Sequence, residues 1–335
     1  MKRISIKDIA KKAGVVPSTV SFVINGKTKE MRISDELAEK VRAVIKETNY
    51  QPNHTAVSLR TGKSKIIGLI VEDISNVFFA TLAKTIEDEA YALGYKIVYC
   101  STENNDEKGS ELIKMLTSQQ VEGFLITPSS GMSGEVSRLL EDKKPVVLMD
   151  RYFTDVDVPY VLVDNKAGIK LGMKHLFSKG HKKIAFITVD LEQVQMQERE
   201  LAYKACMQRK GYDELVLKLS YTIKPEAAVE KIAAFITKTP DLDAVFFATN
   251  YLGVYGLESI NNLKLKIPED LAIICFDDHD IFRLFKPGIT IIKQPIMDIA
   301  VTAIQLLMRQ FQKEELTRKE LHILKTPTLV VRAST

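Results

Sequence analysis

The first fifty residues carry hydrophobic side chains at helical spacing. The positions i, i+3, i+4 and i+7 of a first apolar stripe are Ile6, Ile9, Ala10 and Ala13. This spacing predicts an amphipathic helix, with Ser5 able to cap its first turn and Asp8 placed where the helix dipole favours an acid. Gly14 follows, and glycine supplies the positive φ that a tight turn needs.

A second helix is predicted from Pro17 to about Asn25, because proline suits a first helical position and Asn25-Gly26 suits an end. Its inner face is expected to hold Val16, Val20, Val23 and Ile24. Its outer face is expected to hold Ser18, Ser21, Phe22 and Asn25. A third helix starts at Ser34, with the core stripe Leu37, Val41, Val44 and Ile45. Two short helices around a glycine turn, with a third to bury them, make a helix-turn-helix unit.

Charge is divided unevenly along the chain. Residues 1–65 hold 14 Lys/Arg and 6 Asp/Glu, a formal charge of +8, whereas the other 270 residues hold 33 and 37, a charge of −4. A basic helix-turn-helix unit predicts a nucleic-acid partner, with the second helix in the major groove and its early residues toward the bases. Small side chains there allow close approach, and hydroxyls can donate to phosphate oxygens. A helical bundle that contacts other proteins is the alternative, while a membrane surface would need an apolar stripe that this segment lacks.

Residues 51–60, QPNHTAVSLR, form a second informative stretch. Pro52 ends the preceding helix, and Ala56 and Leu59 would share one face of a new, very short helix. So short a helix is marginal in water and needs a partner to form. A plain linker with a chance leucine is the alternative.

From Ile66 onward, short β-rich runs alternate with helical stretches. The runs are IIGLIV, YKIVYC, GFLIT, PVVLMD, KIAFIT, AVFFAT, LAIICF and ITIIKQP. This alternation predicts parallel sheets with helices on both faces, in two similar α/β lobes. We therefore predict an all-α helix-turn-helix domain at 1–60, its short helix at about 53–60, and a two-lobed α/β domain at 61–335. The lobes are expected at about 65–163 with 295–326, and at about 164–294 with 327–335.

The carboxyl ends of the strands predict a ligand site in the cleft between the lobes, where open α/β sheets bind ligands. Asp277 follows LAIICF directly and can accept from paired hydroxyls. Arg199, expected to open a helix after the loop 188–198, offers a planar donor fork. Facing each other across the cleft, the two could hold a polyol, or Arg199 could hold an anion. The ring faces of Phe78 and Phe79 suit a sugar or a base.

Other classes of protein find less support. No apolar run could span a bilayer, and MKRISIKDIAKK lacks the apolar run of a signal peptide, so we expect a cytoplasmic protein. We expect buried thiols at Cys100, Cys206 and Cys275, and no metal site in the cluster 277–280.

A transport component is one rival function, and it would need an export signal. An enzyme is the other rival, but no phosphate loop, dinucleotide fingerprint or nucleophile elbow is present, so we predict no catalytic residue and no cofactor.

Longer motifs carry a family resemblance. The first sixty residues contain ISIKDIAKKAGV, STVSFVING and VRAVIKETNYQPN, and the body contains IGLIVEDISNVFFATLAKTIED, LMDR, IPEDLAIICFDDHD and KQPIMDIA. With these stretches, residues 3–332 resemble the lactose/purine repressor family of bacterial regulators, and the body also resembles periplasmic sugar-binding proteins. The resemblance implies a DNA-binding transcriptional regulator that acts as a repressor and whose operator affinity is controlled by a small metabolite, a sugar or sugar derivative. Its partners would be pseudo-palindromic double-stranded DNA, the effector and a second copy of the chain, with a tetramer as an alternative to the dimer.

The resemblance also implies roles for single residues of the DNA-binding end. Bases would be read by Pro17, Ser18 and Phe22. The DNA backbone and its surroundings would be contacted by Ser5, Ile6, Thr19, Ser21, Asn25, Tyr50, Asn53 and His54. In the minor groove, Leu59 would act as a wedge between base pairs, with Ala56 allowing close approach.

Three residues depart from the family pattern. Val16 stands where a capping serine is usual. Phe22 stands where Arg or His commonly reads a purine, and a phenyl ring can only pack, for example on a thymine methyl, or else tuck under the domain. Tyr251 stands where an Asp usually follows Asn250, which weakens the case for an ordinary sugar. The effector contacts implied are Asn76, Phe78, Phe79, Arg151, Asp164, Gln193, Arg199, Asn250, Tyr251 and Asp277.

Overall fold

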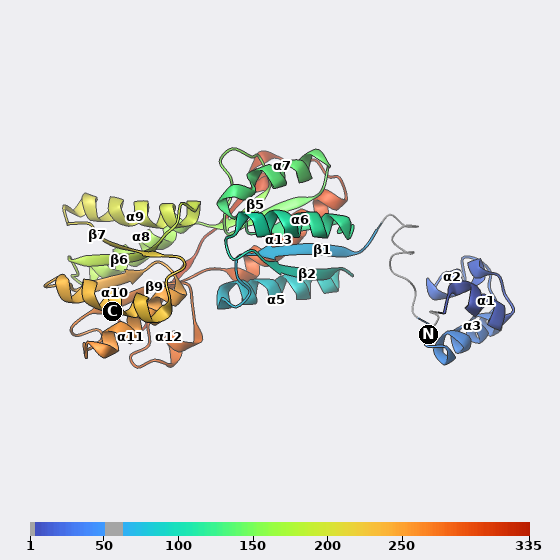
Figure 1. The fold of residues 1–335 in the computed structure, drawn as a ribbon, viewed down its shortest axis with the longest axis horizontal. Helices are drawn as coiled ribbons and strands as arrows, with labels where there is room; N and C mark the ends of the chain where they lie inside the picture. Colours follow the sequence, from blue (N-terminus) through green and yellow to red (C-terminus); the bar gives the residue numbers. More distant parts are fainter. Residues whose placement is uncertain (1–3, 51–62) are drawn as a thin grey trace. The chain divides into compact units, whose positions relative to one another are not determined.

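The computed structural model describes residues 4–50 and 63–335, which belong to two compact units (Figure 1). The first unit ends at Ser64 and the second begins at Lys65, slightly later than the predicted boundary after residue 60. The candidate DNA contacts Asn53, His54, Ala56 and Leu59, and the short helix predicted at about 53–60, lie outside the described residues.

The first unit contains the three predicted helices, α1 (Ile6–Ala13), α2 (Pro17–Ile24) and α3 (Asp35–Glu47). Ser5 and Asp8 form a capping box at the start of α1, in which the Asp8 backbone N–H donates to Ser5 Oγ (3.3 Å) and the Ser5 N–H donates to Asp8 Oδ2 (2.8 Å). Gly14 ends α1 with φ 71°, in the left-handed region. The three helices share a core made of Ile9, Ala10, Ala13, Val20, Val23, Ala38, Val41 and Val44.

The position predicted for Val16 is wrong. We expected its side chain on the inner face of the second helix, but it is 60% exposed. Val16 is the N-cap of α2, with φ −84° and ψ 154°, and it makes no side-chain capping bond. Its backbone is extended, so the helical period that places Val20 and Val23 does not extend to it.

The second unit is built on two six-stranded sheets. The first has the order β11-β5-β4-β3-β1-β2, with all pairs parallel. The second has the order β12-β10-β9-β8-β6-β7, and only the β12–β10 pair is antiparallel. The strands of the first are β1 (Ile66–Val71), β2 (Lys96–Ser101), β3 (Gly123–Ile126), β4 (Val146–Met149), β5 (Tyr160–Val163) and β11 (His322–Lys325). The strands of the second are β6 (Ile184–Asp190), β7 (Leu215–Ser220), β8 (Ala244–Phe247), β9 (Ala272–Phe276), β10 (Thr290–Lys293) and β12 (Thr328–Val330).

Helices cover both faces of each sheet. The first sheet carries α5 (Val77–Ala92) and α13 (Ile296–Phe311) on one face, and α6 (Asp106–Ser118) and α7 (Ser133–Glu141) on the other. The second carries α10 (Pro225–Lys238) and α11 (Asn250–Asn262) on one face, and α8 (Asn165–Ser178) and α9 (Val194–Lys210) on the other. Short helices are η1 (Ser130–Met132), α12 (Asp280–Leu284) and α14 (Arg318–Leu321). This is the α/β architecture that the alternating pattern predicts.

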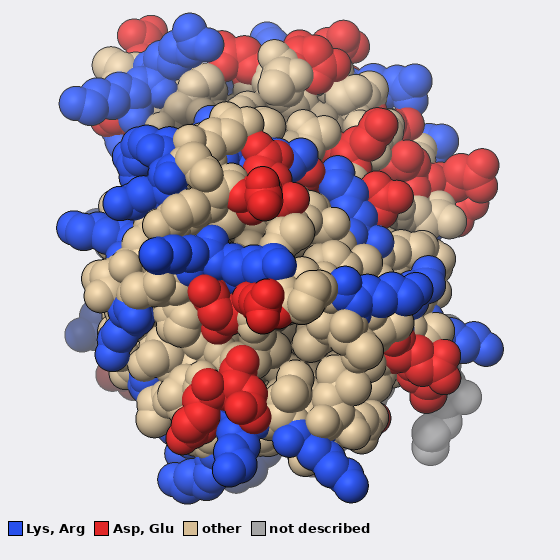
Figure 2. All heavy atoms as spheres, turned by 90° about the vertical axis from the view of Figure 1, so that its left-hand side faces the viewer, with Lys and Arg blue, Asp and Glu red and all other residues tan. Residues whose placement is uncertain are grey.

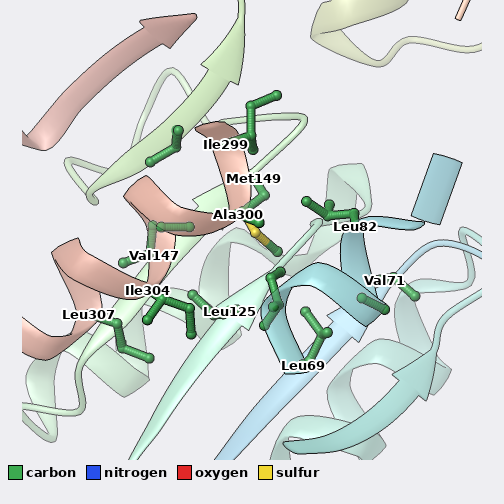
Figure 3. Close-up of a cluster of buried hydrophobic side chains, with 14 of the residues drawn as sticks. Leu69, Val71, Leu82, Leu125, Val147, Met149, Ile299, Ala300, Ile304 and Leu307 are labelled. Carbon is green, nitrogen blue, oxygen red and sulfur yellow. The ribbon is translucent and has the colours of Figure 1, made fainter. Parts of the chain in front are cut away.

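Residues far apart in the sequence complete each core. Figure 3 shows α13 lying against the first sheet, with Ile304 and Leu307 close to Leu125 and Val147. In the sequence α13 follows β10, so it comes after every strand of the second sheet except β12. The chain crosses between lobes again between β11 and β12, one of which joins each sheet. These crossings connect the two lobes (Figure 1).

The surface of the second lobe is mixed in charge. Figure 2 shows Lys and Arg side chains interspersed with Asp and Glu across the end of this lobe. Such a face offers no field of one sign to a polyanion, in contrast to the basic residues 1–65. Within 4–50 and 63–335, no helix has the length and apolar character needed to cross a bilayer.

Candidate functional site

The first unit presents a polar surface on α2. Pro17, Ser18 and Asn25 are exposed, and Thr19, Ser21 and Phe22 are partly buried beside them. The Asn25 side chain donates to the Ser21 carbonyl oxygen (2.6 Å), which orients it against the end of the helix. The other described candidates for DNA contact are Ser5, which is exposed, and Ile6 and Tyr50, which are partly buried. The helix thus carries small polar side chains at its exposed start, where a recognition helix meets base edges.

The second unit contains a cavity at the junction of its two lobes. The space that water-sized molecules can occupy in it is about 40 Å³. All predicted effector contacts except Asp164 line it, namely Asn76, Phe78, Phe79, Arg151, Gln193, Arg199, Asn250, Tyr251 and Asp277. Sequence reasoning missed the other lining residues, which are Glu72, Asp150, Val189, Leu191, Gln195, Met196, Thr249 and Gln294.

Asp164 lies elsewhere. Its side chain caps α8, where Oδ1 accepts a hydrogen bond from the Ala167 N–H (2.8 Å), and it lines a different hollow with Tyr152 and Lys166. The residue follows β5 at the point where the chain crosses into the second lobe. Its carboxylate therefore stabilises a helix end and does not point into the cavity.

Arg151 is the central cation of the first lobe's side of the cavity. It is buried, its Nε donates to Asp150 Oδ2 (3.2 Å) and its Nη1 donates to Asn104 Oδ1 (2.7 Å). Nη2 forms an ion pair with Glu72. Glu72 follows β1 directly, so the rule that selected the other strand-end residues could have found it.

Arg199 occupies a different position from the one we predicted. β6 ends at Asp190 and α9 begins at Val194, so Arg199 lies inside the helix and does not open it. The side chain is only 1% exposed, and its guanidinium lies 3.7 Å above the ring of Phe276. Its Nε donates to Asn165 Oδ1 (2.8 Å), which holds the planar group in place.

Arg199 and Asp277 do not face each other across the cleft. Both belong to the second lobe, with Arg199 Nη1 lying 3.9 Å from Asp277 Oδ2. Asp277 Oδ1 also accepts from Gln294 Nε2 (2.6 Å). The acid that Arg199 meets from the first lobe is Asp150, through its charge. The two residues predicted to face each other across the cleft are therefore an ion pair within one lobe.

Burial changes the acidity of these groups. Loss of solvent raises the pKa of Asp150 to about 7, with Arg199 opposing the change and Asp277 adding to it. Loss of solvent also raises the pKa of Asp277. The same cause lowers the pKa of Arg151 to about 9 and lowers that of Arg199. The junction therefore disfavours charge of either sign, and its ions persist through their mutual contacts.

Amide side chains join the two lobes across the cavity. Asn250 Nδ2 donates to Asn76 Oδ1 (3.1 Å), and Gln193 Nε2 donates to Asn104 Oδ1 (2.7 Å). Gln195 Nε2 lies 3.5 Å from Asp150 Oδ2, while its Oε1 is buried without a partner. A buried acceptor without a partner is unfavourable, so a hydroxyl donor entering here would be stabilised.

The acidic cluster 277–280 is occupied by other contacts. Asp278 pairs with Arg332 (3.4 Å), and His279 caps α12 by accepting from the Ile281 N–H (3.2 Å). No group of three or more His, Cys, Asp or Glu side chains in 4–50 and 63–335 is arranged to hold a metal ion. Cys206 and Cys275 are buried free thiols, and Cys100 is only partly buried.

Each of the two units matches a known protein family. Residues 5–53 match the model of bacterial regulatory proteins of the lacI family, and residues 173–335 match the periplasmic binding protein-like domain. The lac repressor dimer bound to operator and the anti-inducer ONPF has the same fold, with a TM-score of 0.88 over 99% of both chains at 21% identity. A complex of the transcriptional regulator CelR with cellobiose gives a TM-score of 0.71 over 99% of this chain and 100% of that one, at 24% identity.

The sequence itself is related along its whole length to a ribose operon repressor of Halalkalibacterium halodurans. The two are 32% identical over 332 residues, which is 99% of this chain and 97% of the relative. Identity of this extent covers the helix-turn-helix unit, both sheets and the residues of the junction cavity. The chain therefore belongs to the lacI family of bacterial regulatory proteins, with a DNA-binding helix-turn-helix unit joined to a periplasmic binding protein-like unit.

Proposed function

We propose that this chain is a dimeric transcriptional repressor whose operator affinity is controlled by a small polyhydroxy effector bound in the junction cavity. The observation that carries the proposal is the cavity itself, because polar side chains of both lobes converge in it. The relatives support the same class: one is named a ribose operon repressor, and a structural neighbour holds cellobiose.

The cavity can bind a polyol through a few fixed groups. Arg199 and Asp277 form a donor and an acceptor whose positions are set by Asn165 and Gln294. Asn250 adds an amide from the start of α11. Fixed polar groups between apolar walls are typical of small-molecule sites, and here Phe79 and Met196 supply apolar surface.

Control of DNA binding follows from the placement of the cavity between lobes. A ligand that contacts both lobes favours one relative arrangement over others, and it shifts the population by its difference in affinity for the two. Typical coupling between two sites is about 1–3 kcal/mol, which corresponds to roughly 5- to 150-fold in operator affinity. Asn76 and Asn250, which bond each other across the lobes, are the contact that such a ligand would replace or reinforce.

The dimer is proposed from the DNA-binding unit. A single three-helix unit has one recognition helix, and pseudo-palindromic operators are read by two such helices in successive major grooves. In the same proposal two copies of Leu59 wedge the minor groove between the half-sites. We propose no catalytic role, and we place the protein in the cytoplasm, where its DNA would be.

The test is a gel-shift titration of the purified full-length chain. Duplexes selected from a random pool are compared with random duplexes, with and without D-ribose, cellobiose and D-xylulose. We expect a preference for the selected duplex and a change of at least about fivefold in its affinity with an effector. Asn250→Ala should reduce that change, whereas Lys231→Ala, an exposed change on α10, should not. A protein with no preference between the two duplexes would contradict the proposal.

A further inference from the structure

The junction cavity contains more negative than positive groups. Its titratable acids are Glu72, Asp150 and Asp277, and its cations are Arg151 and Arg199. Because the pKa of Asp150 is raised to about 7, its carboxyl is neutral part of the time near that pH. With Glu72 and Asp277 ionised, the lining has a charge of −1 when Asp150 is ionised and zero when Asp150 is neutral.

The donors of Arg151 are already engaged by protein groups. Nε donates to Asp150, and Nη1 donates to Asn104 Oδ1 (2.7 Å) and to the Pro128 carbonyl oxygen (3.3 Å). Nη2 pairs with Glu72, whose side chain is also buried. An arginine placed to hold an incoming anion would keep two parallel N–H groups free for it. Here Glu72 occupies that position.

Helix N-termini could also attract an anion, and those of α5, α9 and α11 reach the cavity. The side chain of Asn76 accepts from the Phe78 N–H (3.0 Å) at the start of α5. At the start of α11, Thr249 accepts from the Leu252 N–H (3.4 Å) and Asn250 accepts from the Tyr251 N–H (2.7 Å). Side chains of the chain therefore already accept from these N–H groups of α5 and α11, whereas the N-cap of α9, Gln193, makes no side-chain capping bond.

We propose that the cavity selects an uncharged polyhydroxy effector over its phosphate or carboxylate derivatives, and that Glu72 sets this selectivity by neutralising Arg151. The inference rests on the proposed function for the identity of the site as an effector site. A phosphate or carboxylate that enters a buried site where Arg151 is paired with Glu72 and Arg199 lies beside Asp277 loses its hydration and gains little in return. A neutral polyol instead meets acceptors and donors such as Asp277, Asn250 and the unpaired Gln195 Oε1.

The experiment measures the melting temperature of the full-length chain with about 20 mM inorganic phosphate, against sodium chloride of equal ionic strength. The chains compared are the wild type, Glu72→Gln, the double variant Glu72→Gln with Arg151→Gln, and Glu258→Gln as a matched exposed change on α11. Phosphate bound to the basic residues 1–65 affects all four alike. We expect Glu72→Gln to gain at least about 2 °C more from phosphate than the wild type, because Arg151 is released. The double variant and Glu258→Gln should behave as the wild type.

Two outcomes of the melting experiment would overturn the inference: an equal gain in the wild type and Glu72→Gln that the double variant lacks, or no extra gain in a folded Glu72→Gln. Circular dichroism checks folding, and Glu72→Ala replaces Glu72→Gln if the latter does not fold. The wild type is also titrated with D-ribose and D-ribose 5-phosphate, and with D-glucose and D-glucose 6-phosphate. Tighter binding of either phosphate ester than of its parent sugar overturns the inference without any variant. If these measurements contradict the selectivity while a sugar still changes operator binding, only the inference about selectivity is wrong. If they support the selectivity while no sugar changes operator binding, only the proposed regulatory function is wrong.

Discussion

Asp150 and Asp277 occupy corresponding positions in the two lobes. Asp150 directly follows β4 of the first sheet and Asp277 directly follows β9 of the second, with φ 63° and 74°. Non-glycine residues in the left-handed region cost about 1–3 kcal/mol each, so the fold stabilises both in spite of this cost. Arg199 acts on both through its charge, and Asp277 raises the pKa of Asp150. The two acids are thus coupled across the junction.

This coupling predicts a pH dependence of stability. The pKa of Asp150 rises from 3.8 in the unfolded chain to about 7 in the folded one. Between these values the folded chain holds a proton that the unfolded chain has lost, so the contribution of Asp150 to stability falls as the pH rises through about 4 to 7. Asp150→Asn removes this loss. The melting temperature of the variant minus that of the wild type should increase from about pH 5 to about pH 8.

Asp213→Asn, a change at an exposed site, is the control for that measurement. Its difference from the wild type should stay level over the same pH range. If the melting temperature of Asp150→Asn minus that of the wild type also stayed constant over this pH range, Asp150 would be ionised in the folded chain at all of these pH values.

The missing cap on α2 predicts that Val16→Ser stabilises the DNA-binding unit. Val16 is exposed and has the extended backbone of an N-cap, but it offers no side-chain acceptor. A serine there can accept from a first-turn N–H, which contributes about 1 kcal/mol. Hydrogen exchange of the α2 amides in the full-length chain measures the gain. Val16→Ala lacks the hydroxyl, and an equal gain with alanine would argue against capping.

Phe22 predicts an operator that differs from those read by arginine. A phenyl ring cannot donate to guanine, so the wild type should select no guanine through this residue, whereas Phe22→Arg should select one. The discrimination expected from such a bidentate contact is about 1–3 kcal/mol. Selection from a random duplex pool with both proteins measures it. Identical selected sequences would place Phe22 away from the bases, as a side chain that packs under the domain.

We predict that the second lobe does not tolerate a side chain at position 256, where the chain has Gly256. A Cβ added there would overlap the ring of Phe247, a fully buried residue of β8. Gly256→Ala should therefore destabilise the chain by about 1–3 kcal/mol through overpacking. Gly134→Ala, in α7 with open space around its Cα, should instead stabilise it by about 0.5–1 kcal/mol. Urea unfolding measures both, and equal effects would mean that packing at Gly256 is not decisive.

The sequence by itself was enough for features that depend on local periodicity. The apolar spacing from Ile6 to Ala13, the turn at Gly14 and the alternation of strands and helices all appear in the structure as predicted. The rule that parallel strands end at a common edge brought Asn76, Arg151, Asn250 and Asp277 into one cavity. These properties depend on neighbouring residues and on the regular periods of helices and strands, so the pattern of residues in a single sequence is enough to predict them.

Only the tertiary structure decided which charges meet. Arg199 and Asp277 share one lobe, Asp164 caps α8 outside the cavity, and Glu72 neutralises Arg151. Glu72 and Arg151 are distant in the sequence, and each pattern alone fits a structural or a binding role. Their pairing depends on how the ends of β1 and β4 are placed with β3 between them, which is a property of sheet order. Charge compensation in a buried site depends on such distances, and local periodicity carries no information about them.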